Sequence, residues 1–96
     1  MIIDGLDLEK EIPLWTLGNE GTSITQEFIF ANFKQAFEFM TLCAECAEKM
    51  DHHPDWSNSW NRVSVVLTTH SVAKLTKLDI ELAKAMDAFA SQIKSS

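Results

Sequence analysis

Apolar and polar positions alternate between residues 22 and 30, a pattern typical of a half-buried β-strand. The positions on one face of this strand are Ile24, Gln26, Phe28 and Phe30. A short apolar run at residues 14–17 precedes it, and residues 18–21, Gly-Asn-Glu-Gly, lie between the two. Glycine and asparagine tolerate the positive φ that tight turns need. The two segments therefore predict a β-hairpin.

From Ala31 onward the apolar residues recur at helical spacing. The predicted inward stripe consists of Phe33, Phe37, Met40, Ala44 and Ala47, widened by Ala36 and Cys43. Asn32 is suited to the N-cap, and the helix is predicted to run to about Met50. Phe39, Leu42 and Cys46 fall beside this stripe, and so wide an apolar arc favours an oligomer.

The rest of the chain predicts a mixed fold. Residues 1–12 predict a short helix that ends before Pro13. Residues 51–61 predict a polar loop. In residues 62–69 apolar and polar positions alternate, which predicts a strand. A last helix begins at Thr76, whose spacing to Asp79 resembles a capping box. Its predicted inward residues are Leu78, Leu82, Met86, Phe89 and Ile93. Strands and helices follow no regular βαβ order, so we predict one α+β domain over residues 1–96 with an antiparallel sheet.

Charge and hydropathy narrow the classes of function. The chain has 8 Lys and Arg against 14 Asp and Glu, a formal net charge of −6, whereas nucleic-acid-binding domains gather basic residues on one face. We therefore expect no direct contact with nucleic acid. No apolar run approaches the roughly 20 residues that span a bilayer, and residues 1–12 lack the regions of a secretory signal. With two cysteines that make no disulfide framework, the sequence predicts a cytoplasmic protein without membrane association.

The three histidines lie near the ends of predicted elements. His52 and His53 follow the long helix, and His70 closes the last strand. Histidine exchanges protons near neutrality because its unperturbed pKa is about 6.5. Glu48 precedes His52 by one helical turn, close enough to orient an imidazole or to pair with it. These residues predict a site for proton transfer.

Other polar and aromatic residues in this region have both a functional and an ordinary interpretation. Trp56 and Trp60 suit a planar ring, but single tryptophans more often lie in cores or interfaces. Asp79 could orient His70 or a substrate amide, and it also complements the helix dipole. The alternative of a metal site rests on Cys43-x-x-Cys46 followed by the paired histidines. Because both cysteines lie inside a helical pattern, we expect no metal and no redox centre.

The run Glu48-Lys49-Met50-Asp51-His52-His53-Pro54-Asp55-Trp56 resembles the EK-x-x-HHP-x-W signature of the pterin-4a-carbinolamine dehydratases. The similarity continues over residues 14–90, through Trp60, Asn61-Arg62-Val63, Leu67-Thr68-Thr69-His70, Leu75-Thr76 and Asp79-Ile80. A doubled His-His-Pro with a Thr-His at this distance is a specific signal. The chain departs from the family pattern at Gln26, where an arginine is usual, at Lys74, where glycine is common, and in its shorter N-terminus.

The resemblance implies a four-stranded antiparallel sheet with helices on one face, including a short strand within residues 55–60. It also implies dimers or tetramers and, in some members, a protein partner such as a transcription factor. The implied reaction is dehydration of a 4a-hydroxytetrahydropterin to the quinonoid dihydropterin, without a cofactor or metal. The residues it assigns to catalysis are His52, His53 and His70. Those it assigns to substrate binding are Glu48, Pro54, Trp56, Thr69 and Asp79.

We interpret His52 and His70 as the proton-transfer pair, with His53 holding or polarising the pterin. Two alternatives from other classes stay open. One is a dehydratase-like module without catalysis, kept for dimerising a partner. The other is an assembly factor in another pathway.

Overall fold

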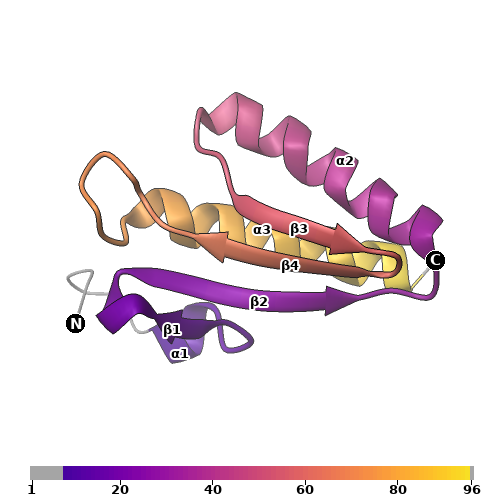
Figure 1. Cartoon of the computed structure of the whole chain (residues 1–96), viewed down its shortest axis with the longest axis horizontal. Helices are drawn as coiled ribbons and strands as arrows, with labels where there is room; N and C mark the ends of the chain where they lie inside the picture. The colour runs from indigo at the N-terminus through magenta and orange to yellow at the C-terminus, as the bar shows by residue number, and fades with distance from the viewer. Residues whose placement is uncertain (1–7, 96) are drawn as a thin grey trace.

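The computed structural model describes residues 8–95, which fold into a four-stranded antiparallel sheet with two long helices (Figure 1). In chain order the elements are α1 (Leu8–Glu11), β1 (Thr16–Gly18), the 3-10 turn η1 (Asn19–Gly21), β2 (Ser23–Ile29), α2 (Phe33–Met50), β3 (Asp55–Ser59), β4 (Arg62–Leu67) and α3 (Lys77–Lys94). The strand order β1-β2-β4-β3 confirms the predicted fold class. Antiparallel pairing of Leu17 with Ile24 confirms the hairpin. Of the helix predicted for residues 1–12, the part over 1–7 lies outside the described residues.

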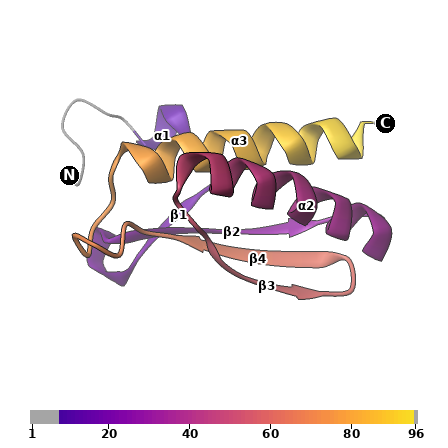
Figure 2. The same ribbon diagram turned by 90° about the horizontal axis from the view of Figure 1, so that it is seen from above.

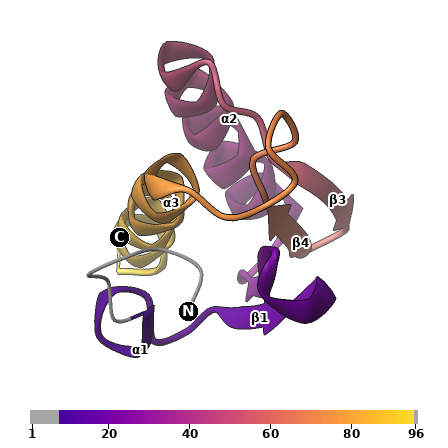
Figure 3. The same cartoon turned by 90° about the vertical axis from the view of Figure 1, so that its left-hand side faces the viewer.

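Both long helices cover the same face of the sheet, as Figure 2 shows from above and Figure 3 from one end. The core lies between these two layers. Alternation along β2 and β4 sends one set of side chains inward, as predicted from the sequence. The buried residues of this set are Ile24, Phe28, Val63, Val65 and Leu67. Within residues 8–95 no helix is both long enough and apolar enough to cross a membrane.

Helix α2 packs on the sheet through a stripe that matches the predicted one only in part, because Ala36, Cys43 and Ala47 are buried as predicted. Phe39 is fully buried, with its ring centroid 4.6 Å from that of Phe28 and 5.0 Å from that of Phe30. Phe33 and Phe37, expected inside, are 47% and 56% exposed. The prediction was wrong for Phe33 and Phe37 because apolar residues surround much of the helix, so spacing alone did not determine which aromatic side chains meet the sheet. The residues that do face the core are Ala36, Phe39, Cys43 and Ala47.

The two ends of α2 are defined by specific hydrogen bonds. At its start the Asn32 side chain accepts from the Gln35 backbone N–H at 2.9 Å, which confirms the predicted N-cap. At its end Asp51 adopts the left-handed conformation with φ 52°. The His52 N–H then donates to the Ala47 carbonyl at 3.0 Å. This reversal stops the helix and directs the paired histidines away from its axis.

Residues 55–59 form the edge strand β3, as the family resemblance implies. The reading of 51–61 as loop was wrong here, because an edge strand exposed along much of its length carries few apolar residues. Helix α3 also differs in detail, since Leu78 is 38% exposed while Ile80 and Ala83 are buried. In the turn before α3, Ala73 and not Lys74 has the positive φ, 53°. Lysine in place of glycine at position 74 therefore requires no left-handed backbone there.

Candidate active site

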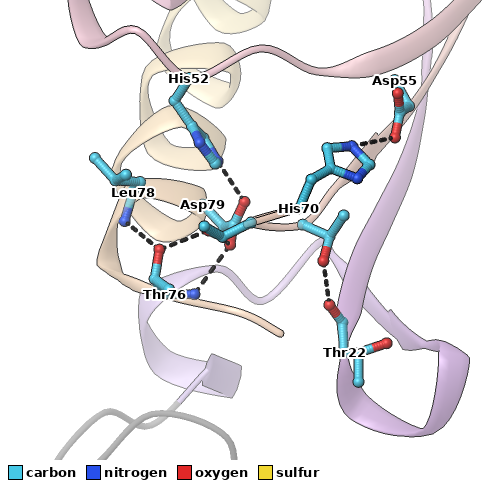
Figure 4. A network of polar contacts seen from close by, with 9 residues as sticks. Thr22, His52, Asp55, His70, Thr76, Leu78 and Asp79 are labelled. Atoms are coloured by element: carbon cyan, nitrogen blue, oxygen red, sulfur yellow. Dashed lines mark hydrogen bonds and ion pairs between the residues drawn. The ribbon is translucent and has the colours of Figure 1, made fainter. Parts of the chain in front are cut away.

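A pocket of about 270 Å³ opens where the end of α2, the end of β4 and the start of α3 meet. This volume is near the lower end of the ~300–1,000 Å³ typical of small-molecule sites. Figure 4 shows His52, His70 and Asp79 entering this region from different segments of the chain. The residues that line the pocket are Asp51, His52, His53, Thr68, Thr69, His70, Ser71 and Leu78. The structure thus brings the three predicted histidines around one cavity.

His52 is the buried member of the set. Its side chain is 8% exposed, and its Nε2 lies 2.6 Å from Oδ1 of Asp79, which is fully buried (Figure 4). A carboxylate only accepts hydrogen bonds, so Nε2 carries the hydrogen and donates it. Nδ1 is then the nitrogen left to exchange a proton with a bound molecule. Asp79 was expected beside His70, but the contact it makes is with His52.

Asp79 belongs at the same time to the cap of α3. Its Oδ2 accepts from the Thr76 backbone N–H at 3.0 Å and from the Thr69 hydroxyl at 2.8 Å. The predicted capping box between Thr76 and Asp79 is confirmed. Every polar contact of this buried carboxylate is thus with a donor, which offsets the cost of removing it from water.

The other two histidines lie at the surface, each beside its own carboxylate. His53 Nε2 is 2.5 Å from Oε2 of Glu48, and their side chains are 54% and 76% exposed. His70 Nε2 is 3.1 Å from Oδ2 of Asp55, with side chains 69% and 60% exposed. Glu48 was expected to reach His52. It meets His53 instead, because the turn at Asp51 directs His52 towards α3.

Asp55 is a partner that the sequence analysis missed. It lies on β3, which had been interpreted as loop, and its contact with His70 spans 15 positions. The family resemblance implied a strand within residues 55–60 but not its partner, and the pairing of Asp55 with Val66 is what brings this carboxylate beside the end of β4. Strand pairing, and not sequence spacing, therefore brings this carboxylate to the site.

The aromatic and proline residues predicted to bind substrate are not among the residues that line the pocket. Trp56 is half-buried on β3, where it packs against the core. Trp60 lies at the β3–β4 turn, 63% exposed and with φ 51°. Pro54 is half-buried in the connection between α2 and β3. Substrate binding by Trp56 and Pro54 stays a prediction.

The cysteines considered as metal ligands lie on α2 and not at the pocket. Cys43 is fully buried in the core. Burial, followed by the neighbouring Cys46, raises the pKa of the Cys43 thiol far above its ordinary value, which opposes formation of a thiolate ligand. Cys46 Sγ lies 3.8 Å from Sδ of Met50. Across the part of the chain that the structure describes, no three His, Cys, Asp or Glu side chains are grouped so as to hold a metal ion.

Comparisons with known proteins show which family the chain resembles. The family model described as pterin 4 alpha carbinolamine dehydratase matches residues 4–89. A protein of Chelativorans sp. (strain BNC1), named provisionally for that activity, is 49% identical over 83 residues, which are 86% of this chain and 85% of the relative. A similarly named protein of Mesorhizobium japonicum is 53% identical over 77 residues, 80% of this chain and 79% of the relative.

Two solved structures share the fold. A crystal structure of a transcriptional coactivator/pterin dehydratase from Brucella melitensis has a TM-score of 0.80 and 42% identity, covering 86% of this chain and 92% of the other. A pterin dehydratase-like protein identified as a RuBisCO assembly factor in the alpha-carboxysome has a TM-score of 0.71 and 18% identity. The match covers 83% of this chain and 93% of the other. The second likeness concerns the fold alone. Because the family model matches most of the chain and the relatives are about half identical to it, the chain belongs to the pterin 4 alpha carbinolamine dehydratase family.

Proposed function

We propose that the protein catalyses dehydration of a 4a-hydroxytetrahydropterin to the quinonoid dihydropterin and water. The observation that carries this proposal is that three histidines, each with its own carboxylate partner, surround one pocket. Paired imidazoles can give and accept protons near neutral pH. Membership of the family supports the same substrate class. A cytoplasmic location is part of the proposal.

The reaction is an elimination without net oxidation. The C4a–O bond breaks, and the oxygen leaves as water after taking a proton from an acid. N5 loses its proton to a base, and the electron pair of that N–H bond forms the C4a=N5 double bond. One proton is delivered and one is removed, so the enzyme returns to its starting state after proton exchange.

The proposed roles follow from burial and from which ring nitrogen is free. His52 and His70 form the proton-transfer pair. His52 is held in place by Asp79 and presents Nδ1, whereas His70 is exposed and can exchange its proton with solvent between turnovers. His53 holds or polarises the pterin, and Glu48 positions its ring.

A direct assay tests the proposal. Purified protein is expected to accelerate the decay of freshly generated 4a-hydroxytetrahydropterin above the rate in buffer, measured by the absorbance of the quinonoid product. The rate should be unchanged after treatment with EDTA, because the proposed chemistry uses no metal. If the decay rate equals that in buffer and in heat-denatured protein, the enzymatic assignment is wrong.

A second candidate function is a protein-interaction module without catalysis. The exposed apolar side chains of α2 favour it, since Phe33 and Phe37 lie with ring centroids 5.8 Å apart at the surface. Among the structural neighbours, one is described as a coactivator and another as an assembly factor. Failure of the dehydration assay by a folded protein would select this candidate.

We also propose that the protein forms a homodimer or homotetramer through this surface of α2. Phe39, Leu42 and Cys46, from which an oligomer was first inferred, pack against the core, so the argument now rests on Phe33 and Phe37. Leaving large apolar side chains in water forgoes about 1.5–3 kcal/mol each, which association would recover.

Light scattering at micromolar concentration is expected to give two or four times the chain mass of 10.8 kDa. The variant Phe37→Glu should reduce the mass to that of one chain, because it places a charge in the contact. The matched control Val72→Glu, at a 49% exposed residue outside α2, should leave the mass unchanged. A single-chain mass for the unaltered protein would exclude the oligomer.

A further inference from the structure

Four side chains, those of Thr76, Thr69, Asp79 and His52, are joined by hydrogen bonds whose donors all point towards Asp79. Figure 4 shows Thr76, Asp79 and His52 in this arrangement. The direction follows from the partners. Asp79 can only accept, so the Thr69 hydroxyl donates its hydrogen to Oδ2 of Asp79 at 2.8 Å. The Thr69 oxygen must then accept the hydrogen of the Thr76 hydroxyl across 2.7 Å. The Thr76 oxygen in turn accepts the Leu78 backbone N–H at 3.3 Å.

We infer that Thr69 is a positioning residue, whose hydroxyl holds the Asp79 carboxylate in the orientation that keeps His52 in its Nε2–H form. As a statement about catalysis, this rests on the proposed function. The sequence placed Thr69 among the substrate-binding residues. Its hydroxyl hydrogen is already donated to Asp79, and the residue is only 9% exposed.

The hydrogen bonds of Asp79 show how the Thr69 hydroxyl fixes the orientation of the carboxylate. Asp79 Oδ2 has two described donors, the Thr69 hydroxyl and the Thr76 N–H, while Oδ1 receives His52. With both donors present, rotation of the carboxylate would break contacts on both oxygens. Without the Thr69 hydroxyl, one bond on Oδ2 is lost and the Thr76 hydroxyl loses its acceptor. The carboxylate is then less constrained, and so is the hydrogen position on the imidazole.

Thr69→Val removes the hydroxyl at nearly constant volume, and Thr69→Ser retains it. We expect Thr69→Val to lower kcat about tenfold with little change in KM, as for loss of one hydrogen bond to a charged group. Thr69→Ser should restore kcat. A substrate-binding role predicts the opposite, a raised KM, because that contact would be lost on binding.

The second readout needs no activity. Long-range ¹H–¹⁵N NMR spectra of ¹⁵N-histidine protein distinguish the two neutral ring tautomers, and spectra of His53→Gln and His70→Gln identify the signals of His52. We expect a single Nε2–H form in the unaltered protein and in Thr69→Ser, and a mixture in Thr69→Val. Thr68→Val is the matched control, since the Thr68 hydroxyl donates to the Thr22 carbonyl at 2.6 Å and not to Asp79. It should leave the His52 tautomer unchanged.

The two readouts separate the inference from the proposed function. If the protein is not a dehydratase, the spectra still decide whether Thr69 controls the His52 ring. An unchanged single tautomer in folded Thr69→Val would overturn the inference, as would a raised KM with unaltered kcat. Should Thr69→Val fail to fold, Thr69→Ala provides the same comparison with a smaller side chain.

Discussion

Replacing His52 by glutamine is expected to lower kcat for dehydration by about 10²–10⁴-fold, the usual contribution of one positioned acid or base. Glutamine can still donate a hydrogen bond to Asp79, so the buried carboxylate keeps a partner. It cannot exchange a proton near neutral pH. The loss should therefore appear in kcat, measured by stopped-flow absorbance, with KM changed much less.

Substitutions of the two exposed histidines separate an effect on catalysis from an effect on stability. His70→Ala should lower kcat by at least tenfold without loss of stability, because its side chain is 69% exposed. His53→Ala should mainly raise KM, in keeping with a role in holding the pterin. Near-normal turnover in a folded variant lacking both His52 and His70 would disprove the elimination mechanism proposed above.

The second large effect is expected from Asp79→Asn. The amide oxygen can still accept from Thr69 and from the Thr76 N–H, so the cap of α3 is kept. The amide nitrogen would then donate to His52 Nε2, which forces the hydrogen onto Nδ1. An Nδ1–H imidazole cannot accept a proton at that nitrogen, and kcat should fall by 10² or more, on the order of the loss known for a wrong tautomer in the Ser-His-Asp triad.

Asp87→Asn is the matched control for this substitution. Asp87 lies two turns further along α3, where it accepts from the Trp15 indole at 3.1 Å and from the Gln26 amide at 3.0 Å. The same exchange of oxygen for nitrogen there should leave kcat within about twofold, since no pocket histidine contacts it. Equal losses of kcat in both variants would show that the effect of Asp79→Asn comes from the stability of α3 and not from His52.

Local features of the fold could be predicted from the sequence alone. The alternation in residues 22–30 and 62–69, the Asn32 cap and the capping box at Thr76 all depend on residues within about one turn or one strand. The His-His-Pro run likewise identified the family, which the family model confirms. In each case neighbours in the sequence are also neighbours in space, so spacing carries the information.

Tertiary structure decided which side of α2 is buried and which carboxylate meets which histidine. Phe37 and Phe39 are equally apolar, and only docking on β2 selects Phe39 for the core. His52 and Asp79 are 27 positions apart, and a helix, two strands and a turn must be in place before they meet. Sequence spacing alone suggested Glu48 for His52, because the two are one helical turn apart. The left-handed residue Asp51 ends the helix between them, so the chain turns and His52 reaches the buried carboxylate of α3 instead.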